Sequence, residues 1–369
     1  MAPHRSSALP LAWLYAGLIV YASLYPFAGW RWPSTSPWAF LLLPWSRYWT
    51  AFDLVSNLLG YLPLGLLIFT AQVRSGRSAA TGGLLAVGLA SLLSLAMEVT
   101  QNGLPARIPS NVDWALNTLG AASGAALGGL MKALGLLERW QRWRDRWFVD
   151  HSAGGLTLLL LWPVGLLFPT ALPLGVGQVL SRLRVAVASL LADTPLAAWG
   201  RSVFEMPQPA PTLAPLGELG VIALGLLAPC MLSFAVSRAG WRRALLVLGI
   251  ALAGVGATTL STALNFGPDH AWAWFTLSAA VGLSLGALGA WLLVWVPRRA
   301  AAALGLMALT ALVLLVAQAP EDAYYAQSLH GWEQGRFIRF HGAAQWVGWL
   351  WPYAAMAYLL GRVAARDHT

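Results

Sequence analysis

Two carboxylates, two amides and one arginine gather where two apolar segments of the sequence meet. Glu98 and Gln101 end the first segment, Asp113 and Asn117 begin the second, and Arg107 lies between them. Spacings of i,i+3 and i,i+4 place each pair on one face of a helix. Polar and ionisable side chains are costly within a membrane, so this group is the candidate site, with Glu98 as the candidate general base.

A second pair has the same pattern earlier in the chain. Asp53 and Asn57 stand at i,i+4 at the start of another apolar segment, as Asp113 and Asn117 do. Because a helix rises 1.5 Å per residue, each asparagine lies about 6 Å deeper than its aspartate. We therefore expect three helix ends to present polar side chains at one depth.

Structural roles compete with a functional one at some of these positions. An aspartate at a helix N-terminus accepts free backbone N–H groups and suits the dipole, and asparagines hydrogen-bond between helices. Glu98 differs, because it ends its helix, where negative charge is unfavourable. We expect a compensating partner, with Arg107 as the first candidate, or uptake of a proton.

The neighbouring residues predict how the helices are arranged. Turn-forming residues at 102–105 and 108–110 predict a helical hairpin with Arg107 at its tip. Gly120, Gly124 and Gly128 form a ridge of small residues that lets another helix approach closely. Pro63 frees a backbone carbonyl near Asn57 and predicts a kink.

The composition predicts an all-α, polytopic membrane protein. Of 369 residues, 58% are apolar and only 10% are charged, which lies outside the balance of soluble domains. The net charge of +9 does not indicate nucleic acid, because no basic face with stacking aromatic residues lies outside the apolar segments. Cys230 is the single cysteine and the histidines have no ligand spacing, so we expect neither metal nor cofactor.

Ten apolar segments have the length that a helix needs to cross a bilayer. They are residues 9–27, 53–71, 79–98, 113–136, 154–172, 215–236, 244–263, 273–296, 300–318 and 345–362. We take the first as a retained span rather than a cleaved signal. Alternate loops and the two termini carry 15 of the 23 Lys and Arg residues. By the positive-inside rule both termini are cytoplasmic, and the candidate residues are at the outer surface.

These features divide the chain into three regions. Residues 1–136 are expected to form a four-helix membrane domain. In residues 137–153, tryptophans continue a helical stripe that begins at Leu136, and arginines lie beside it. This pattern predicts a cytoplasmic amphipathic helix in the lipid interface. Residues 154–369 are expected to form a block of about six helices with an outer loop at 173–214.

Taken together, the polar residues resemble the pattern of the VanZ-like membrane protein family. The pattern reads Asp53-x-x-x-Asn57 with Pro63-Leu-Gly65, Ser94-x-x-x-Glu98-x-x-Gln101, Arg107, and Asp113-x-x-x-Asn117-x-x-Gly120-x-x-x-Gly124, within residues 10–135. The family is named for an accessory protein of low-level resistance to the glycopeptide teicoplanin, and its biochemical activity is not settled. The resemblance implies the bacterial inner membrane and work on the cell envelope.

The leading hypothesis is an outward-facing pocket for the headgroup of an envelope lipid or a lipid-linked cell-wall precursor. Arg107 would hold phosphate or carboxylate, and the amides of Asn57, Gln101 and Asn117 would bond sugar or amide groups. Glu98 would position Arg107 or act on the substrate.

Three alternatives stay open. An enzyme of lipid-linked phosphate intermediates would use Glu98 as a base, with Asp53 and Asp113 holding a divalent metal. A transporter or flippase would need polar groups that continue through the bilayer. A scaffold would use the cluster only for stability. The sequence gives no oligomeric state.

Overall fold

The computed structural model describes residues 7–25, 27–33, 36–45, 51–105, 107–168, 170, 172–179, 187, 190–191, 194–196, 215–319 and 338–365. Among these residues every regular element is a helix, apart from one isolated bridge between Phe148 and Ser237. The predicted all-α class is therefore confirmed. The chain divides into two compact units, Met1–Arg146 and Trp147–Thr369, and each is described by itself.

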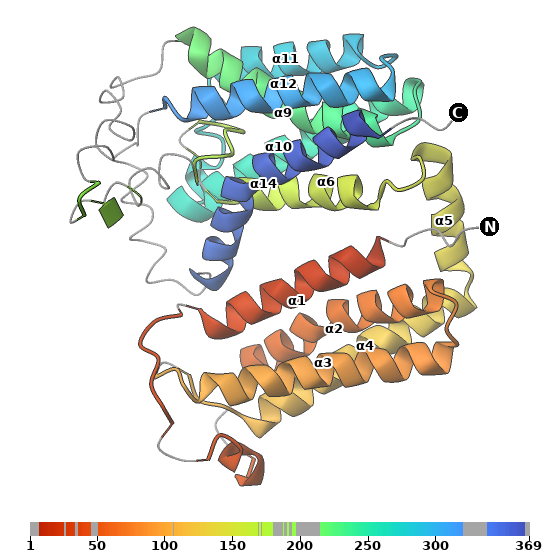
Figure 1. Cartoon of the computed structure of the whole chain (residues 1–369), viewed down its shortest axis with the longest axis vertical. Coiled ribbons are helices and arrows are strands. Elements are labelled where there is room, and N and C mark those ends of the chain that lie inside the picture. Colours follow the sequence, from red (N-terminus) through yellow and green to blue (C-terminus); the bar gives the residue numbers. More distant parts are fainter. Residues whose placement is uncertain are drawn as a thin grey trace. The chain divides into compact units, whose positions relative to one another are not determined.

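The N-terminal unit is built from four long helices and a shorter amphipathic one. They are α1 (Ala8–Leu24), α2 (Ala51–Arg74), α3 (Ala79–Gln101), α4 (Asn111–Ala133) and α5 (Leu136–Trp147), with a short 3-10 helix, η1, at Ala39–Leu42. Helices α2, α3 and α4 pack against one another, and α1 packs on α2 and α3 (Figure 1). The predicted hairpin is confirmed as α3 and α4.

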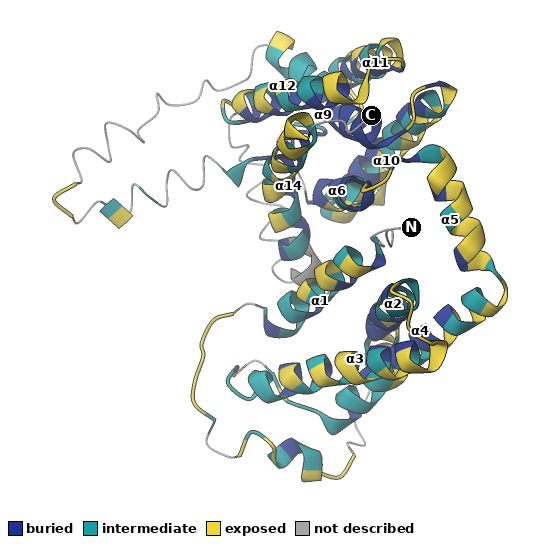
Figure 2. Ribbon diagram, turned by 45° about the vertical axis from the view of Figure 1, so that its right-hand side comes forward, coloured by how far each residue is buried: buried dark blue, intermediate teal, exposed yellow. Residues whose placement is uncertain are grey.

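A sharp bend separates α4 from α5. The chain turns at Gly135, whose φ of +65° is left-handed, the conformation that glycine adopts without strain after a helix end. The two helices meet at 74°. Many residues of α5 are exposed (Figure 2). An amphipathic helix thus stands where the arginine and tryptophan pattern predicts one, and its location in the lipid interface stays a prediction.

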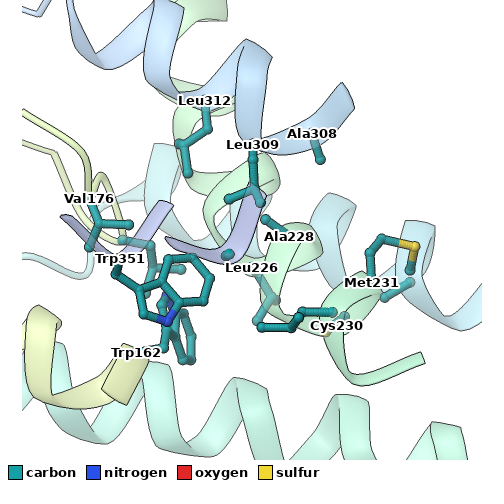
Figure 3. Packing of buried hydrophobic residues seen from close by; sticks show 14 of the residues in the cluster. Trp162, Val176, Leu226, Ala228, Cys230, Met231, Ala308, Leu309, Leu312 and Trp351 are labelled. Atoms are coloured by element: carbon teal, nitrogen blue, oxygen red, sulfur yellow. The ribbon is translucent and has the colours of Figure 1, made fainter. Parts of the chain in front are cut away.

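The C-terminal unit surrounds one buried helix. Its elements are α6 (Ala153–Leu166), α9 (Pro215–Val236), α10 (Trp241–Phe266), η2 (Pro268–His270), α11 (Leu277–Leu292), α12 (Arg298–Val316) and α14 (Ile338–Ala364). Helix α9 contacts the other five α-helices, and every residue from 228 to 236 is buried. Figure 3 shows the apolar packing of α9 with Trp162 of α6, Leu309 of α12 and Trp351 of α14. The predicted loop at 173–214 lies mostly outside the described residues.

One arginine is fully buried in this unit. Arg243, in the first turn of α10, donates through Nη2 to Phe234 O (2.7 Å) and Ser237 O (3.1 Å). Its Nη1 donates to Val294 O (3.0 Å) and Val296 O (2.6 Å). The guanidinium therefore satisfies carbonyls at the end of α9 and in the turn that follows α11, where a cation suits the helix dipoles.

A helix overlaps each of the ten predicted apolar segments. Five of these helices are long and apolar enough to cross a membrane, namely α2 from Leu54 onward, α3, α9, α10 and α12. The bent pair α4 and α5 makes six if it is counted as one span, and α1, α6 and α11 are shorter apolar helices. The chain is a membrane protein by this measure, while the count of ten spans and the cytoplasmic termini stay predictions.

Candidate functional site

The α3–α4 hairpin is closed by a cap at the start of α4. Ser110 is the N-cap residue, and its Oγ accepts a hydrogen bond from Asp113 N at 3.2 Å. Asp113 lies in the first turn of α4, where its charge suits the dipole. The N-cap residue is therefore Ser110 rather than Asp113, for which capping and function were both left open.

Glu98 is buried against the beginning of α4. Only 4% of its surface is exposed, and its Oε2 accepts a hydrogen bond of 2.8 Å from Ser110 N. In a capping box this N–H is bound by the acidic residue three positions later in the same helix. Here Glu98 reaches it from α3. The carboxylate ends its own helix, where charge is unfavourable, but it faces the favourable N-terminus of the next one.

Asn117 contacts α3 one helical turn further from the hairpin loop than Glu98 does. Its Nδ2 donates to Ser94 Oγ at 2.9 Å, and Tyr61 of α2 also interacts with the Ser94 side chain. Asn117 is only 6% exposed, and its Oδ1 has no hydrogen-bond partner among the described residues. A buried acceptor without a donor costs about 1–3 kcal/mol, so this oxygen needs an explanation.

The polar contact between α3 and α4 continues further along the helices. Trp114 Nε1 donates to Ser91 Oγ at 3.0 Å, and Thr118 Oγ1 and Ser91 Oγ are 2.9 Å apart. Ser91, Ser94 and Glu98 share one helix face at i, i+3 and i+7. We call these residues, with Trp114, Asn117 and Thr118 of α4, the polar seam. Sequence reasoning overlooked Ser91, Trp114 and Thr118, and their facing periodicities are the signal that would have found them.

Gln101 and Arg107 bind the end of α1. Gln101 Nε2 donates to Ser23 O at 3.0 Å. Arg107 Nη2 donates to Ala22 O and Tyr25 O, both at 3.1 Å. Ala22 and Ser23 lie in the last turn of α1 and Tyr25 directly follows it, so these carbonyls have no partners inside the helix. Two of the predicted ligand-binding residues therefore fasten α1 to the hairpin, and the expected pairing of Arg107 with Glu98 stays a prediction.

The glycine ridge brings α2 and α4 together. A methyl group on Gly120 or Gly124 would collide with the carbonyl oxygens of Leu58 and Leu62, and one on Gly65 would collide with Ala121 O. The predicted close approach is confirmed. Pro63 lies inside α2, as expected.

The structure describes fewer contacts for the first aspartate–asparagine pair, Asp53 and Asn57. Asn57 is half-buried on α2, one residue before the contact of Leu58 with Gly120, and makes no hydrogen bond with other described residues. Asp53 lies in α2, but its side chain is outside the described part of the chain.

The site is rich in acceptors. Glu98 accepts from Ser110 N, and Asn117 binds Ser94, which precedes Glu98 by one helical turn, while the described donors of Gln101 and Arg107 bind α1. Within the described residues no group of three or more His, Cys, Asp or Glu side chains could hold a metal ion. Such an arrangement can accept hydrogen bonds from hydroxyl, amide or ammonium groups.

Comparison with known proteins identifies the N-terminal segment. The family model described as VanZ/LLP1 matches residues 12–132, which contain all seven candidate residues. Neither the curated proteins nor the solved structures contain a match. Residues 12–132, from α1 to the end of α4, are thus a VanZ-like segment of a membrane protein.

Proposed function

We propose that the VanZ-like segment recognises the headgroup of an envelope lipid or a lipid-linked glycan at the outer face of a bacterial inner membrane. The observation that carries the proposal is the buried Oδ1 of Asn117, which has no hydrogen-bond partner within the part of the chain that the structure describes. The same Asn117 side chain binds Ser94, which lies on the face of α3 that also carries Glu98. A buried acceptor without a described donor, one helical turn from the level of a buried carboxylate, is suited to a ligand that brings hydrogen-bond donors.

The chemistry of the site narrows the ligand class. Glu98 and Asn117 Oδ1 both accept hydrogen bonds, so sugar hydroxyls, amide N–H groups and ammonium groups fit them better than phosphate does. The Nη2 of Arg107 binds two carbonyls of α1. We therefore assign Arg107 and Gln101 to holding α1 in place, and Glu98 with Asn117 to the ligand.

Access to the site involves the ends of α3 and α4. Glu98 and Asn117 are 4% and 6% exposed, so the ligand enters between the helix ends rather than binding on the surface. The nearby segment 36–45 is tied to the hairpin by Asn102 Nδ2 to Pro37 O (3.1 Å) and Asn111 Nδ2 to Leu43 O (2.6 Å). Breaking these exposed or half-buried bonds is the opening step we propose.

The lipids that copurify with the full-length protein test the proposal. The protein would be extracted in mild detergent, and its retained lipids identified by mass spectrometry. We expect a hydroxyl- or amine-bearing species with the native sequence and at least a tenfold loss with Asn117→Leu or Glu98→Gln, since each removes a described acceptor or its charge (about 1.5–3 kcal/mol).

Ser91→Ala is the matched control, because it alters the polar seam away from Asn117 Oδ1. It should retain the same lipid as the native chain at equal membrane abundance. Identical lipid profiles for all variants would refute the proposal. Teicoplanin susceptibility of the same strains then shows whether binding affects resistance, and chelator-sensitive turnover of a lipid-linked phosphate would identify the enzyme instead.

A further inference from the structure

Helix α5 presents three different faces that the proposed site does not use. Leu137 and Arg144 are buried on one side, at 8% and 5% exposure. Arg139, Arg142 and Arg146 are exposed, and at about 100° per residue they fall on the opposite side. The helix therefore packs through one face and leaves a row of cations away from it.

A tryptophan stripe runs beside the arginine row. Trp140 and Trp143 are 53% and 42% exposed, and their rings stack with centroids 5.1 Å apart. Each follows directly after an arginine of the row, so the indoles lie between the cations and the packed face. Indole rings with an adjacent cationic edge are typical of helices that lie at the boundary of acyl chains and headgroups.

The position of α5 fits that boundary. It follows α4 at a bend of 74° and so runs across the axis of a helix in the family-matched bundle. Arg74, the last residue of the apolar helix α2, reaches Leu137 O through Nη2 at 3.5 Å. The start of α5 therefore lies beside the end of a candidate membrane span.

We infer that α5 is a binding site for anionic phospholipid. The exposed guanidinium groups bind the lipid phosphate, and Trp140 and Trp143 contact the upper acyl chains. Four arginines of α5 outnumber Glu138 and Asp145, which gives the helix a net charge of +2. Charge complementarity alone would also suit a free anion, and the indole stripe is what favours a lipid.

Thermal unfolding of the purified full-length protein in a neutral detergent tests this site. We expect short-chain phosphatidylglycerol to raise the unfolding temperature, while short-chain phosphatidylcholine and inorganic phosphate do not. The triple variant Arg139→Gln, Arg142→Gln, Arg146→Gln should need at least about tenfold more lipid for the same shift. These positions are exposed and glutamine is a good helix former, so the fold should persist.

Two further variants separate the possible outcomes. Arg238→Gln combined with Arg242→Gln removes two cations outside α5 and should leave the response unchanged. Trp140→Ala combined with Trp143→Ala keeps the cations and should weaken the lipid response. An unchanged response in the triple variant overturns the inference. An equal response to inorganic phosphate also overturns it, because the site would then bind free anions rather than lipid.

Discussion

Helices α3 and α9 show two different ways of packing a membrane helix. In the most apolar stretch of α3 only 22% of the residues are buried, and its contact with α4 includes the hydrogen bonds of the polar seam. The corresponding stretch of α9 is 72% buried in an apolar cluster. Because lipid is as apolar as leucine, helices in a bilayer associate through close packing and hydrogen bonds. The N-terminal unit relies on both, and the C-terminal unit mainly on packing.

Three charged side chains of the two units are nevertheless placed in the same way. Glu98 faces the N-terminus of α4, and Arg243 faces carbonyls at the end of α9. Arg107 does the same at the end of α1. Each side-chain charge is set against the opposite end of a helix dipole. Helix ends thus provide partners that a protein with few charged residues would otherwise lack.

Removing the buried arginine of the C-terminal unit should have the largest effect. Arg243→Met leaves four backbone carbonyls without their donor, which we expect to cost about 3–5 kcal/mol. The neighbouring Arg242→Met, on a half-buried side chain, should cost less than about 1 kcal/mol. Unfolding in detergent measures both, and equal effects would show that the buried hydrogen bonds of Arg243 do not stabilise this unit.

The contact between α2 and α4 should be nearly as sensitive. Gly124→Ala places a methyl group against the carbonyl oxygen of Leu62, and relief requires a backbone shift, at a cost of about 3 kcal/mol. Gly129→Ala, in the same helix, meets only an ordinary contact with Phe69 at 3.9 Å and should be neutral or stabilising. The two variants would be compared by their abundance in the membrane and by their unfolding temperatures. Equal tolerance would mean that the helices lie farther apart.

Loss of the α1 cap should be smaller and local. Arg107→Leu removes two charged hydrogen bonds to the last turn of α1, which we expect to cost about 2 kcal/mol. Hydrogen exchange should rise in residues 20–25 and much less in α4. The exposed Arg77→Leu serves as the control. Unchanged exchange in residues 20–25 would show that Gln101 alone is enough to hold α1.

The smallest stability effect of these tests should come from a conservative change at Glu98, which we assign to the ligand. Glu98→Gln keeps an oxygen that can accept from Ser110 N, so the cost should stay below about 1 kcal/mol. Glu98→Leu strands that N–H group and should cost about 2 kcal/mol. If both variants lose the same stability, the charge rather than the hydrogen bond holds the hairpin.

Hydropathy was enough to place the helices but not to establish their topology. Apolar runs of the right length predict where α1, α2, α3 and α4 lie, and turn residues predict the hairpin. The glycine spacing predicted the close approach of another helix, because only small residues permit it, and the structure shows that this helix is α2. Which helices cross the bilayer, and in which direction, depends on how each helix interacts with the lipid, and hydropathy alone does not determine that.

The sequence indicated which residues lie near the ends of α3 and α4 better than it indicated their hydrogen-bond partners. Depth along the helices singled out Glu98 and Asn117, and both lie in the polar seam. Depth says nothing about direction around the bundle, so it did not reveal that Gln101 and Arg107 face α1. Ser91 and Thr118 were not predicted. Single hydroxyl residues are common in apolar helices, and their role becomes clear only from the residue that they contact on the neighbouring helix.

The capping of α1 by Arg107 also has a consequence for biosynthesis. Arg107 follows Ala22 by 85 residues. At about 5–20 residues per second, translation leaves α1 waiting about 4–17 seconds for the side chain that completes it. During that interval water or lipid headgroups must donate the hydrogen bonds that the terminal carbonyls of α1 accept. Helix α1 can therefore be capped only after Arg107 has been synthesised, and chains that stall before Arg107 will expose an unfinished helix end to quality-control proteases.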